Sequence, residues 1–289
     1  MKNTLLSDIT NHLAPISSSP ALEASVLLAH VVGKPRSWVL AHPELTLSNK
    51  QNEKLNVSLT RLESGEAFPY VLGNWEFFGL DFKVTPDVLI PRPETELLVE
   101  KAIAWLNKNL ERQNIADVGT GSGAIAVSLA VNLPDASILA TDISPQALEV
   151  AKHNAEKQGV SDRINFIECD LLPHPQPLSQ WERDEGVREI DVICANLPYI
   201  PTKTLQKLPI FGREPTLALD GGNTGFELIQ RLMQITPEYL SPNSLMLFEI
   251  EETLGREATA LAHQFFPSAV IELHKDLAGR DRLLQIQLP

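Results

Sequence analysis

The sequence predicts an α/β protein in which a small helical domain precedes a mainly parallel, doubly wound sheet with helices on both faces. Three observations support this fold class. From about Pro93 onward, segments with helical and strand-like hydrophobic patterns alternate along the chain. A glycine-rich turn joins the first of these strands to the helix that follows it. The last two strands are joined only by KDLAGRD, which is too short for a parallel crossover, so we expect them to pair antiparallel.

Composition limits the kinds of partner. The chain has 289 residues, of which 43% are apolar and 21% charged, so it can bury a core and is not a disordered protein. Its formal net charge of -13 is unfavourable for bulk DNA or long RNA, which attract basic surfaces. A basic protein partner is easier to accommodate. We therefore expect no direct nucleic-acid substrate.

The sequence shows no pattern typical of a metal site, a disulfide or a membrane span. Cys169 and Cys194 lie in or beside apolar strand-like segments, and we expect two buried, reduced thiols. The seven histidines are scattered, and neither Cys-x-x-Cys nor His-Glu-x-x-His occurs. No apolar run reaches the roughly 18–20 residues of a membrane span, and the amphipathic N-terminus does not resemble a signal peptide. We expect a cytoplasmic protein without a metal.

Hydrophobic periodicity divides the chain into three parts. Residues 1–69 form the expected N-terminal helical domain, because apolar residues recur there at helical spacing and further helical segments follow at Pro20–His30 and about Ser48–Leu62. Residues 70–86 are aromatic, alternating and interrupted by glycine turns, which predicts a β-hairpin linker. Residues 87–289 form the large α/β domain.

The elements of the large domain are read from the same patterns. We expect helices at 94–110, 122–133, 145–158, 226–240 and 256–266, and strands at 114–118, 137–141, 164–168, 190–195, 244–250, 269–274 and 282–288. Pro173 to Glu189, rich in proline and charge, should be a long, mobile surface loop without a function. A seven-stranded sheet that ends in an antiparallel hairpin resembles the Rossmann-like sheet of class I S-adenosylmethionine-dependent methyltransferases.

The first strand of the sheet leads into the candidate cofactor loop, ADVGTGSGAIA, at residues 116–126. Glycine lets a ligand lie against the backbone, and the helix N-terminus offers free N–H groups. The residues expected to bind the cofactor here are Gly119, Thr120, Gly121 and Gly123. Gly119-x-Gly121-x-x-Ala124 also satisfies the dinucleotide fingerprint, so the loop alone leaves a nicotinamide cofactor and S-adenosylmethionine both open.

Two carboxylates extend this candidate cofactor site. Asp142 follows the second strand, where it can accept hydrogen bonds from ribose hydroxyls. Asp170 follows the third strand at the same sheet edge. In the methyltransferases that the sheet resembles, an acid at this place commonly meets the adenine amino group.

The fourth strand ends in ANLPYIP, residues 195–201, and this tip is the candidate catalytic segment. It resembles the Asn/Asp-Pro-Pro-Tyr/Phe motif of amino methyltransferases, which act on planar nitrogens. Two acceptors, the side-chain oxygen of Asn196 and the main-chain carbonyl of Leu197, could hold both N–H bonds of an amide. Pro198 stiffens the tip, and Tyr199 could stack on the planar group. Asn196 would also border the cofactor.

Leu197 departs from the motif, which has proline at this position. Proline would fix φ, but the carbonyl that accepts the hydrogen bond is present in every residue. Leu197 also precedes Pro198, which biases its backbone toward extended conformations. We therefore expect the site to function.

The flanking segments narrow the resemblance. VLIPRPETELLVE at 88–100, REPTLALDGGNTGFELIQRL at 213–232 and KDLAGRDRLL at 275–284 resemble the peptide chain release factor glutamine N5-methyltransferases. This resemblance implies S-adenosylmethionine as methyl donor and, as substrate, the Gln of the Gly-Gly-Gln loop of class I release factors. It places Arg92 and Glu214 on the substrate side, beside Gly221-Gly222. It also implies that the N-terminal domain docks the release factor.

Three alternatives stay open. An adenine-N6 DNA or RNA-base methyltransferase would share the tip chemistry, but it needs a basic surface and usually a recognition domain. A nicotinamide-dependent oxidoreductase would use the glycine loop and leave Asn196 and Tyr199 unexplained. A non-catalytic protein of the same fold would make Leu197 the mark of a decayed motif, which the intact Asn196 and Tyr199 argue against.

Overall fold

The computed structural model describes residues 4–173 and 189–289. Contacts within the chain divide it into two compact units, residues 1–74 and 75–289, which are described separately. Most of the loop expected at 173–189 lies outside the described residues. None of the described helices is long and apolar enough to cross a membrane.

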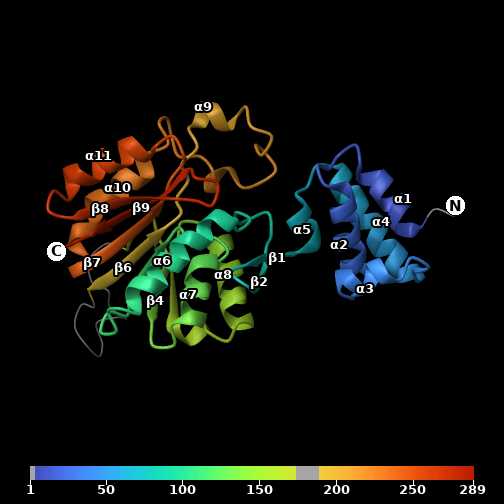
Figure 1. Cartoon of the computed structure of the whole chain (residues 1–289), viewed down its shortest axis with the longest axis horizontal. Coiled ribbons are helices and arrows are strands. Elements are labelled where there is room, and N and C mark those ends of the chain that lie inside the picture. Colours follow the sequence, from blue (N-terminus) through green and yellow to red (C-terminus); the bar gives the residue numbers. More distant parts are fainter. Residues whose placement is uncertain (1–3, 174–188) are drawn as a thin grey trace. The chain divides into compact units, whose positions relative to one another are not determined.

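The N-terminal unit is entirely helical (Figure 1). Its helices are α1 (Leu5–Leu13), α2 (Pro20–Val32), α3 (Arg36–Ala41), α4 (Asn49–Glu63) and α5 (Phe68–Leu72). A capping box fixes the start of α4, since the side chain of Ser48 accepts from the Gln51 N–H and the Gln51 side chain accepts from the Ser48 N–H. Apolar residues of all five helices form one core, which includes Leu13, Leu27 and Leu28.

The hairpin after this unit is shorter than the sequence predicts. Strands β1 (Asn74–Phe77) and β2 (Leu80–Lys83) pair, but residues 68–72 are the helix α5 instead of the start of a linker. Pro69 stands in the first turn of this helix, and Gly73 ends it in the left-handed conformation. Phe77 and Phe82 are fully buried in the core of the large unit, so the hairpin belongs to that unit.

The large unit contains a seven-stranded sheet in the order β5-β4-β3-β6-β7-β9-β8. Its strands are β3 (Asn114–Val118), β4 (Ser137–Asp142), β5 (Ile164–Glu168), β6 (Ile190–Ala195), β7 (Leu240–Glu249), β8 (Val270–Lys275) and β9 (Asp281–Gln287). The strands from β5 to β7 pair in parallel, whereas β9 pairs antiparallel with both β7 and β8. The predicted mainly parallel sheet with an antiparallel C-terminal hairpin is confirmed.

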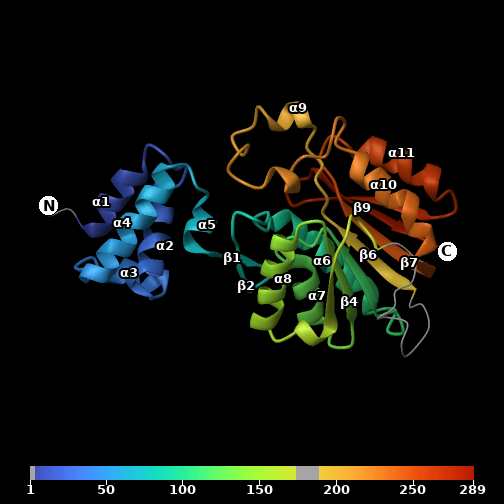
Figure 2. The same cartoon turned by 180° about the vertical axis from the view of Figure 1, so that it is seen from behind.

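Helices cover both faces of the sheet (Figures 1 and 2). One face packs against α6 (Glu96–Leu106), α7 (Ala124–Asn132) and α8 (Pro145–Lys157), and the other against α10 (Glu227–Ile235) and α11 (Gly255–Phe265). Successive residues of a strand point to opposite faces. Ile115 of β3 accordingly lies in one core and Ala116 in the other.

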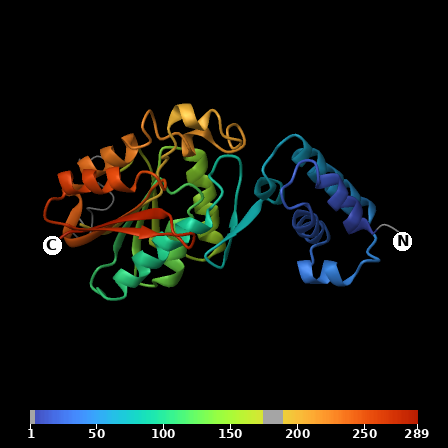
Figure 3. The same ribbon diagram turned by 45° about the horizontal axis from the view of Figure 1, so that its top comes forward.

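Short elements lie between the main ones. They are the helix α9 (Thr202–Leu205) and the 3-10 turns η1 (Pro93–Thr95), η2 (Ser161–Arg163), η3 (Thr216–Ala218) and η4 (Thr236–Glu238). The segment after β6, which carries α9, runs over the top of the sheet in Figure 1, and the tilt of Figure 3 brings it forward. It therefore covers the edge at which the parallel strands end, where doubly wound sheets bind their ligands.

Candidate active site

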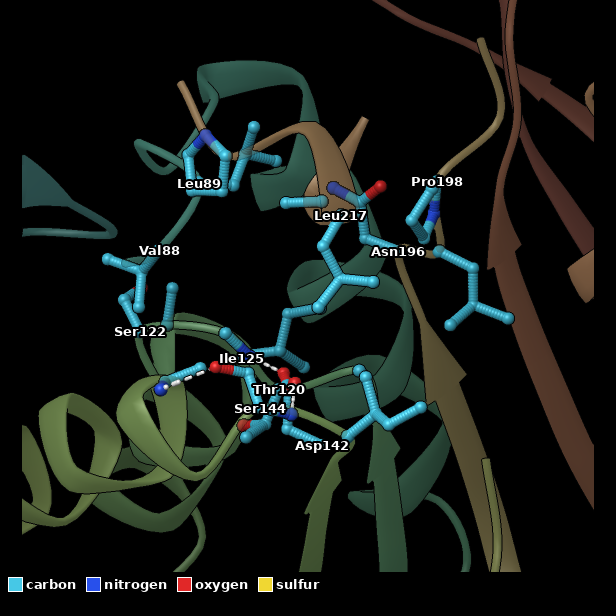
Figure 4. Close-up of a pocket in the computed structure, with 18 of the residues that line it drawn as sticks. Val88, Leu89, Thr120, Ser122, Ile125, Asp142, Ser144, Asn196, Pro198 and Leu217 are labelled. Atoms are coloured by element: carbon cyan, nitrogen blue, oxygen red, sulfur yellow. Dashed lines mark hydrogen bonds between the residues drawn. The ribbon is translucent and has the colours of Figure 1, made fainter. Parts of the chain in front are cut away.

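A cavity of about 430 Å³ opens at the carboxyl edge of the sheet (Figure 4). It is lined by the turns that follow β3, β4, β5 and β6 and by residues 86–95. Of the residues predicted to bind the cofactor, the lining contains Gly119, Thr120, Gly121, Asp142, Asp170 and Asn196.

Gly123, the remaining predicted cofactor residue, is outside this lining and lies where two helices pack closely. It is the N-cap of α7 with φ of 80°, and a side chain there would bring its Cβ 3.1 Å from Cβ of Ala151. Gly123 therefore allows α7 to approach α8 closely, which is a packing role.

Main-chain hydrogen bonds hold the glycine loop beside Asp142. The N–H groups of Gly119 and Thr120 both donate to the carbonyl of Thr141, at 2.9 and 2.8 Å. The Gly121 N–H donates to Oδ2 of Asp142 at 2.9 Å, and the Ser144 N–H donates to Oδ1 at 2.9 Å. Burial raises the pKa of Asp142, while these N–H groups oppose the shift. The Ile143 N–H is a third backbone donor to this carboxylate. A carboxylate has about four acceptor sites, so Asp142 can still accept from a ligand.

Asp117, which sequence reasoning missed, lies beneath the loop as a fully buried acid. Its Oδ2 accepts from the Thr120 hydroxyl at 2.7 Å and from the Ala126 N–H at 3.0 Å, whereas its Oδ1 has no partner among the described residues. Burial raises the pKa of Asp117 to about 7. Its place two residues before the first glycine was the only sequence signal.

At the far side of the cavity Asp170 forms an ion pair with Arg231 of α10. The Arg231 Nη2 lies 2.6 Å from Oδ2 of Asp170, and both side chains are about half exposed. Both residues line the cavity. No pattern in the sequence singles out Arg231, because it is one polar residue on the exposed side of an amphipathic helix.

The tip after β6 separates this cavity from a second, smaller one of about 140 Å³. Asn196, Leu197 and Pro198 line both cavities, and Tyr199 lines only the smaller one. Arg92 also borders both. The predicted catalytic tip thus borders both cavities, so its residues can contact a ligand in either one.

The side chain of Leu197 packs on the cofactor loop. It is buried, and a Cβ added at Gly119 would lie only 2.9 Å from Cδ2 of Leu197. The absence of a side chain at Gly119 therefore leaves room for Leu197 as well as for a ligand. The residue that departs from the proline motif is part of the packing between the tip and the loop.

The segment 219–225 packs against the tip and forms main-chain hydrogen bonds with it. The Ile200 N–H donates to the Leu219 carbonyl at 3.1 Å, and the Gly221 N–H donates to the Ile200 carbonyl at 2.9 Å. A side chain at Gly221 would put its Cβ 2.7 Å from the Pro198 carbonyl oxygen, and one at Gly225 would put its Cβ closer still to the Tyr199 carbonyl oxygen. Both glycines allow two backbones to touch.

Two buried residues outside the predicted set contact the tip. The Asn196 Nδ2 donates to the Thr95 hydroxyl at 3.0 Å, and this hydroxyl donates to Oε2 of Glu249 at 2.6 Å. The Tyr199 hydroxyl donates to Oε1 of Glu249 at 3.3 Å. Burial raises the pKa of Glu249, and the bonds from Thr95 and Tyr199 and the charge of Arg282 oppose that shift. Burial also raises the pKa of Tyr199.

Arg92 and Glu214, both predicted on the substrate side, bind each other. Nη2 of Arg92 lies 2.5 Å from Oε1 of Glu214, and the Ile90 N–H donates to Oε2 at 3.1 Å. Glu214 is buried, whereas the Arg92 side chain is 31% exposed. Glu214 therefore holds the 90–92 segment in place, and Arg92 is the member of the pair that can still reach a ligand.

Neither of the two thiols is activated as a thiolate. Cys194 is fully buried in β6 and Cys169 is half-buried, and burial raises the pKa of both thiols. They form no disulfide with each other. Within residues 4–173 and 189–289 no group of three or more His, Cys, Asp or Glu side chains could hold a metal ion.

Solved structures with a similar fold are methyltransferases. The chain superimposes with a TM-score of 0.54 on the catalytic domain of hMettl16 in complex with the MAT2A 3′UTR hairpin 6, at 16% identity, covering 85% of this chain and 86% of that one. It superimposes with a TM-score of 0.50 on the human methyltransferase 10 domain containing protein, at 18% identity, covering 85% and 100%. These likenesses establish the fold.

Sequence comparison identifies the family. Residues 4–73 match the PrmC N-terminal domain, and residues 110–265 match a methyltransferase domain. The release factor glutamine methyltransferase of Moorella thermoacetica is 41% identical over 264 residues, which cover 91% of this chain and 89% of the relative. That of Coxiella burnetii is 36% identical over 283 residues, covering 96% and 95%. The chain belongs to the release factor glutamine methyltransferase family, and its methyl donor is S-adenosylmethionine.

Proposed function

We propose that this protein methylates the side-chain amide nitrogen, N5, of the Gln in the Gly-Gly-Gln loop of class I release factors and thereby modulates translation termination. One observation supports this proposal most strongly. Asn196 lies in the wall between the larger and the smaller cavity, and among the described residues its Oδ1 accepts no hydrogen bond. An oxygen in that place can accept from an amide N–H in the smaller cavity.

The residues of the larger cavity fit the methyl donor. Its volume of about 430 Å³ lies within the range of small-molecule sites. Asp142 is suited to ribose hydroxyls and Asp170 to the adenine amino group, while the loop from Gly119 to Gly121 lets the ligand lie against the backbone. S-adenosylmethionine supplies an electrophilic methyl group on a sulfonium, so the protein needs no strong base or metal of its own for activation.

The tip residues act on the acceptor amide. An amide nitrogen is a poor nucleophile because its lone pair is delocalised into the carbonyl. Asn196 Oδ1 and the Leu197 carbonyl accept its two N–H bonds, which favours a pyramidal, nucleophilic nitrogen. Tyr199 stacks against the planar group and orients it. The hydrogen bond of its hydroxyl to Glu249 keeps the ring in place.

The remaining features fit a protein substrate. Arg92, held by Glu214, borders both cavities and can contact the main chain of the Gly-Gly-Gln loop. The N-terminal unit, residues 1–69 of the predicted division, is the proposed docking domain for the release factor. Because that substrate is a translation factor, we place the enzyme in the cytoplasm.

A nucleic-acid base is the second candidate substrate, because hMettl16 shares the fold and was solved with a 3′UTR hairpin. The net charge of -13 argues against it, since nucleic-acid binding depends on cationic side chains near phosphates. We therefore propose that the protein has no direct nucleic-acid substrate.

The proposal is tested with labelled S-adenosylmethionine and four acceptors. These are a purified class I release factor, its variant with Gln replaced by Glu in the Gly-Gly-Gln loop, duplex DNA and an RNA hairpin. Label is expected only on the unaltered release factor. Label on either nucleic acid, or equal label on the Gln-to-Glu variant, would show that the substrate assignment is wrong.

A further inference from the structure

The hydrogen bonds behind Asn196 have a defined direction. The side-chain amide of Asn196 can present either its oxygen or its NH2 group to the acceptor, and only the oxygen can accept from an amide N–H. The structure turns Nδ2 toward Thr95, with Nδ2 to Oγ1 at 3.0 Å. The question is what makes this orientation preferred over the flipped one.

Glu249 determines what the Thr95 hydroxyl can do. A hydroxyl has one proton to donate, and Thr95 donates it to Oε2 of Glu249 at 2.6 Å. Toward Asn196 the same hydroxyl can then only accept, so Nδ2 must face it. If Glu249 presented a donor, the Thr95 proton would turn to Asn196 and draw its oxygen away from the acceptor cavity.

The surroundings keep Glu249 an acceptor. Its second oxygen accepts from the Tyr199 hydroxyl at 3.3 Å. Burial raises the pKa of Glu249, and the charge of Glu94 adds to this shift. The hydroxyls of Thr95 and Tyr199 and the charge of Arg282 lower the pKa by stabilising the carboxylate. Two hydroxyls that both donate to Glu249 match the carboxylate, which can only accept. Both Thr95 and Glu249 are buried, so water does not compete for these bonds.

We propose that Thr95 and Glu249 are positioning residues that fix the side-chain amide of Asn196 with its oxygen toward the acceptor. They act through Asn196 and Tyr199, because the Glu249 carboxylate binds Tyr199 directly and Asn196 through the Thr95 hydroxyl. This inference rests on the proposed methylation of an amide. It adds that the direction of a buried hydrogen-bond chain, in addition to the motif itself, is required for turnover.

The first test is a set of single variants assayed with a release factor. Glu249→Gln allows both orders of donor and acceptor, so kcat should fall about tenfold, somewhat less than for loss of a whole hydrogen-bonding group at a preorganised site. The KM for the release factor and the Kd for S-adenosylmethionine should stay within about threefold. Unchanged kcat in a folded Glu249→Gln protein would overturn the proposal.

The second test reverses the direction of the hydrogen bonds that link residue 249, Thr95 and residue 196. Asn196→Asp alone should lose at least about 100-fold in kcat, because a carboxylate then faces a hydroxyl that can only accept. In Asn196→Asp with Glu249→Gln, Tyr199 can donate to the Gln oxygen, the Gln NH2 group to Thr95, and Thr95 to Asp. The double variant should therefore exceed Asn196→Asp in kcat by about tenfold. Additive losses would overturn the proposal.

A matched control separates hydrogen-bond direction from charge. Adding Thr95→Val to this double variant leaves every charge unchanged and removes the hydroxyl that would donate to Asp, so the rescue should be lost. A rescue that persists without the Thr95 hydroxyl would show that charge repulsion alone links the two sites, and would overturn the proposed direction.

Variants of Thr95 provide a third test, which leaves the Glu249 carboxylate unaltered. Thr95→Ser keeps the hydroxyl, whereas Thr95→Val keeps the volume and loses it. The Ser variant should retain kcat within about threefold, and the Val variant should lose about tenfold. Equal kcat in both variants would overturn the inference. An inactive wild-type protein would instead contradict the proposed function, so the two failures are distinguishable.

Discussion

Asn196 is the residue on which the proposed chemistry depends most. Its Nδ2 is bound to Thr95, which leaves Oδ1 for the acceptor. We expect Asn196→Ala to lower turnover by roughly 10²–10³, by analogy with the loss of one hydrogen-bonding group at a preorganised site. The Kd for S-adenosylmethionine, measured by calorimetry, should change little, because the glycine loop and Asp142 remain. Unchanged turnover in this variant would contradict the amide-holding mechanism.

Asp117 gives a prediction about pH and stability. Its pKa rises from an ordinary 3.8 to about 7 because the side chain is fully buried. Between these values the folded protein keeps a proton that the unfolded chain has lost, so this group lowers the free energy of unfolding as pH rises. The shift of about three pKa units corresponds to roughly 4 kcal/mol, and the effect is complete above about pH 7.

Asp117→Asn isolates this contribution. An Asn oxygen can still accept from Thr120 and Ala126, and it has no charge to desolvate. We expect the free energy of unfolding of the variant minus that of the wild type, both measured in urea, to increase between pH 5 and pH 8. Asp142 and Cys194 are the groups whose titration is coupled to the charge of Asp117. A difference that stays constant over this range would rule out a buried Asp117 that titrates near 7.

At the scale of elements, the turn at 219–225 holds the tip that follows β6. A Cβ at Gly221 would lie 2.7 Å from both the Pro198 carbonyl oxygen and Cα of Tyr199, and backbone atoms cannot yield as a flexible side chain can. We expect Gly221→Ala to lower kcat/KM by about 100-fold, because a shift of about 1 Å in a positioning group can cost that much. The measurement is the steady-state rate of release factor methylation.

Gly212→Ala is the control for this prediction. Gly212 has φ of 76°, and a Cβ there meets nothing within 4 Å. The control variant therefore carries the backbone strain of a left-handed residue, about 1–2 kcal/mol, without moving the tip. If Gly212→Ala lost as much kcat/KM as Gly221→Ala, reduced stability would explain the effect and displacement of the tip would not.

Elements were easier to predict from the sequence than the contacts between them. Strands β3, β5 and β6 have the predicted bounds, because an apolar run with polar or glycine ends is a local pattern. The helices α3, α5 and α9 were not predicted, since each has at most six residues and shows too little periodicity. The hairpin linker was placed too early for the same reason.

Only those parts of the candidate site that lie in contiguous sequence motifs could be predicted from the sequence. The tip and the glycine loop are contiguous segments, and the structure brings both to one cavity. Glu249 bonds to Thr95 across 154 positions and Thr95 to Asn196 across 101, so only the folded sheet shows that they meet. Arg92 and Glu214 were both predicted near the substrate, but their mutual ion pair was not, because no local pattern links them.

At the scale of the whole molecule, each unit has its own core. The three clusters of buried apolar residues in the described chain each lie within one unit, one in residues 1–74 and two in residues 75–289. The tip, the glycine loop and both cavities are built from the second unit alone. We therefore expect residues 75–289 to fold by themselves and to bind S-adenosylmethionine.

If the first unit serves to dock the release factor, its removal should affect substrates according to their size. For residues 75–289, kcat/KM for an intact release factor should fall by about tenfold or more, which corresponds to about 1.4 kcal/mol of lost docking energy. For a short Gly-Gly-Gln peptide, which is too small to reach a separate docking surface, kcat/KM should stay within about threefold of the full chain. Equal losses on both substrates would mean that the N-terminal unit supports the catalytic unit itself, and equal retention on both would remove its proposed role in docking.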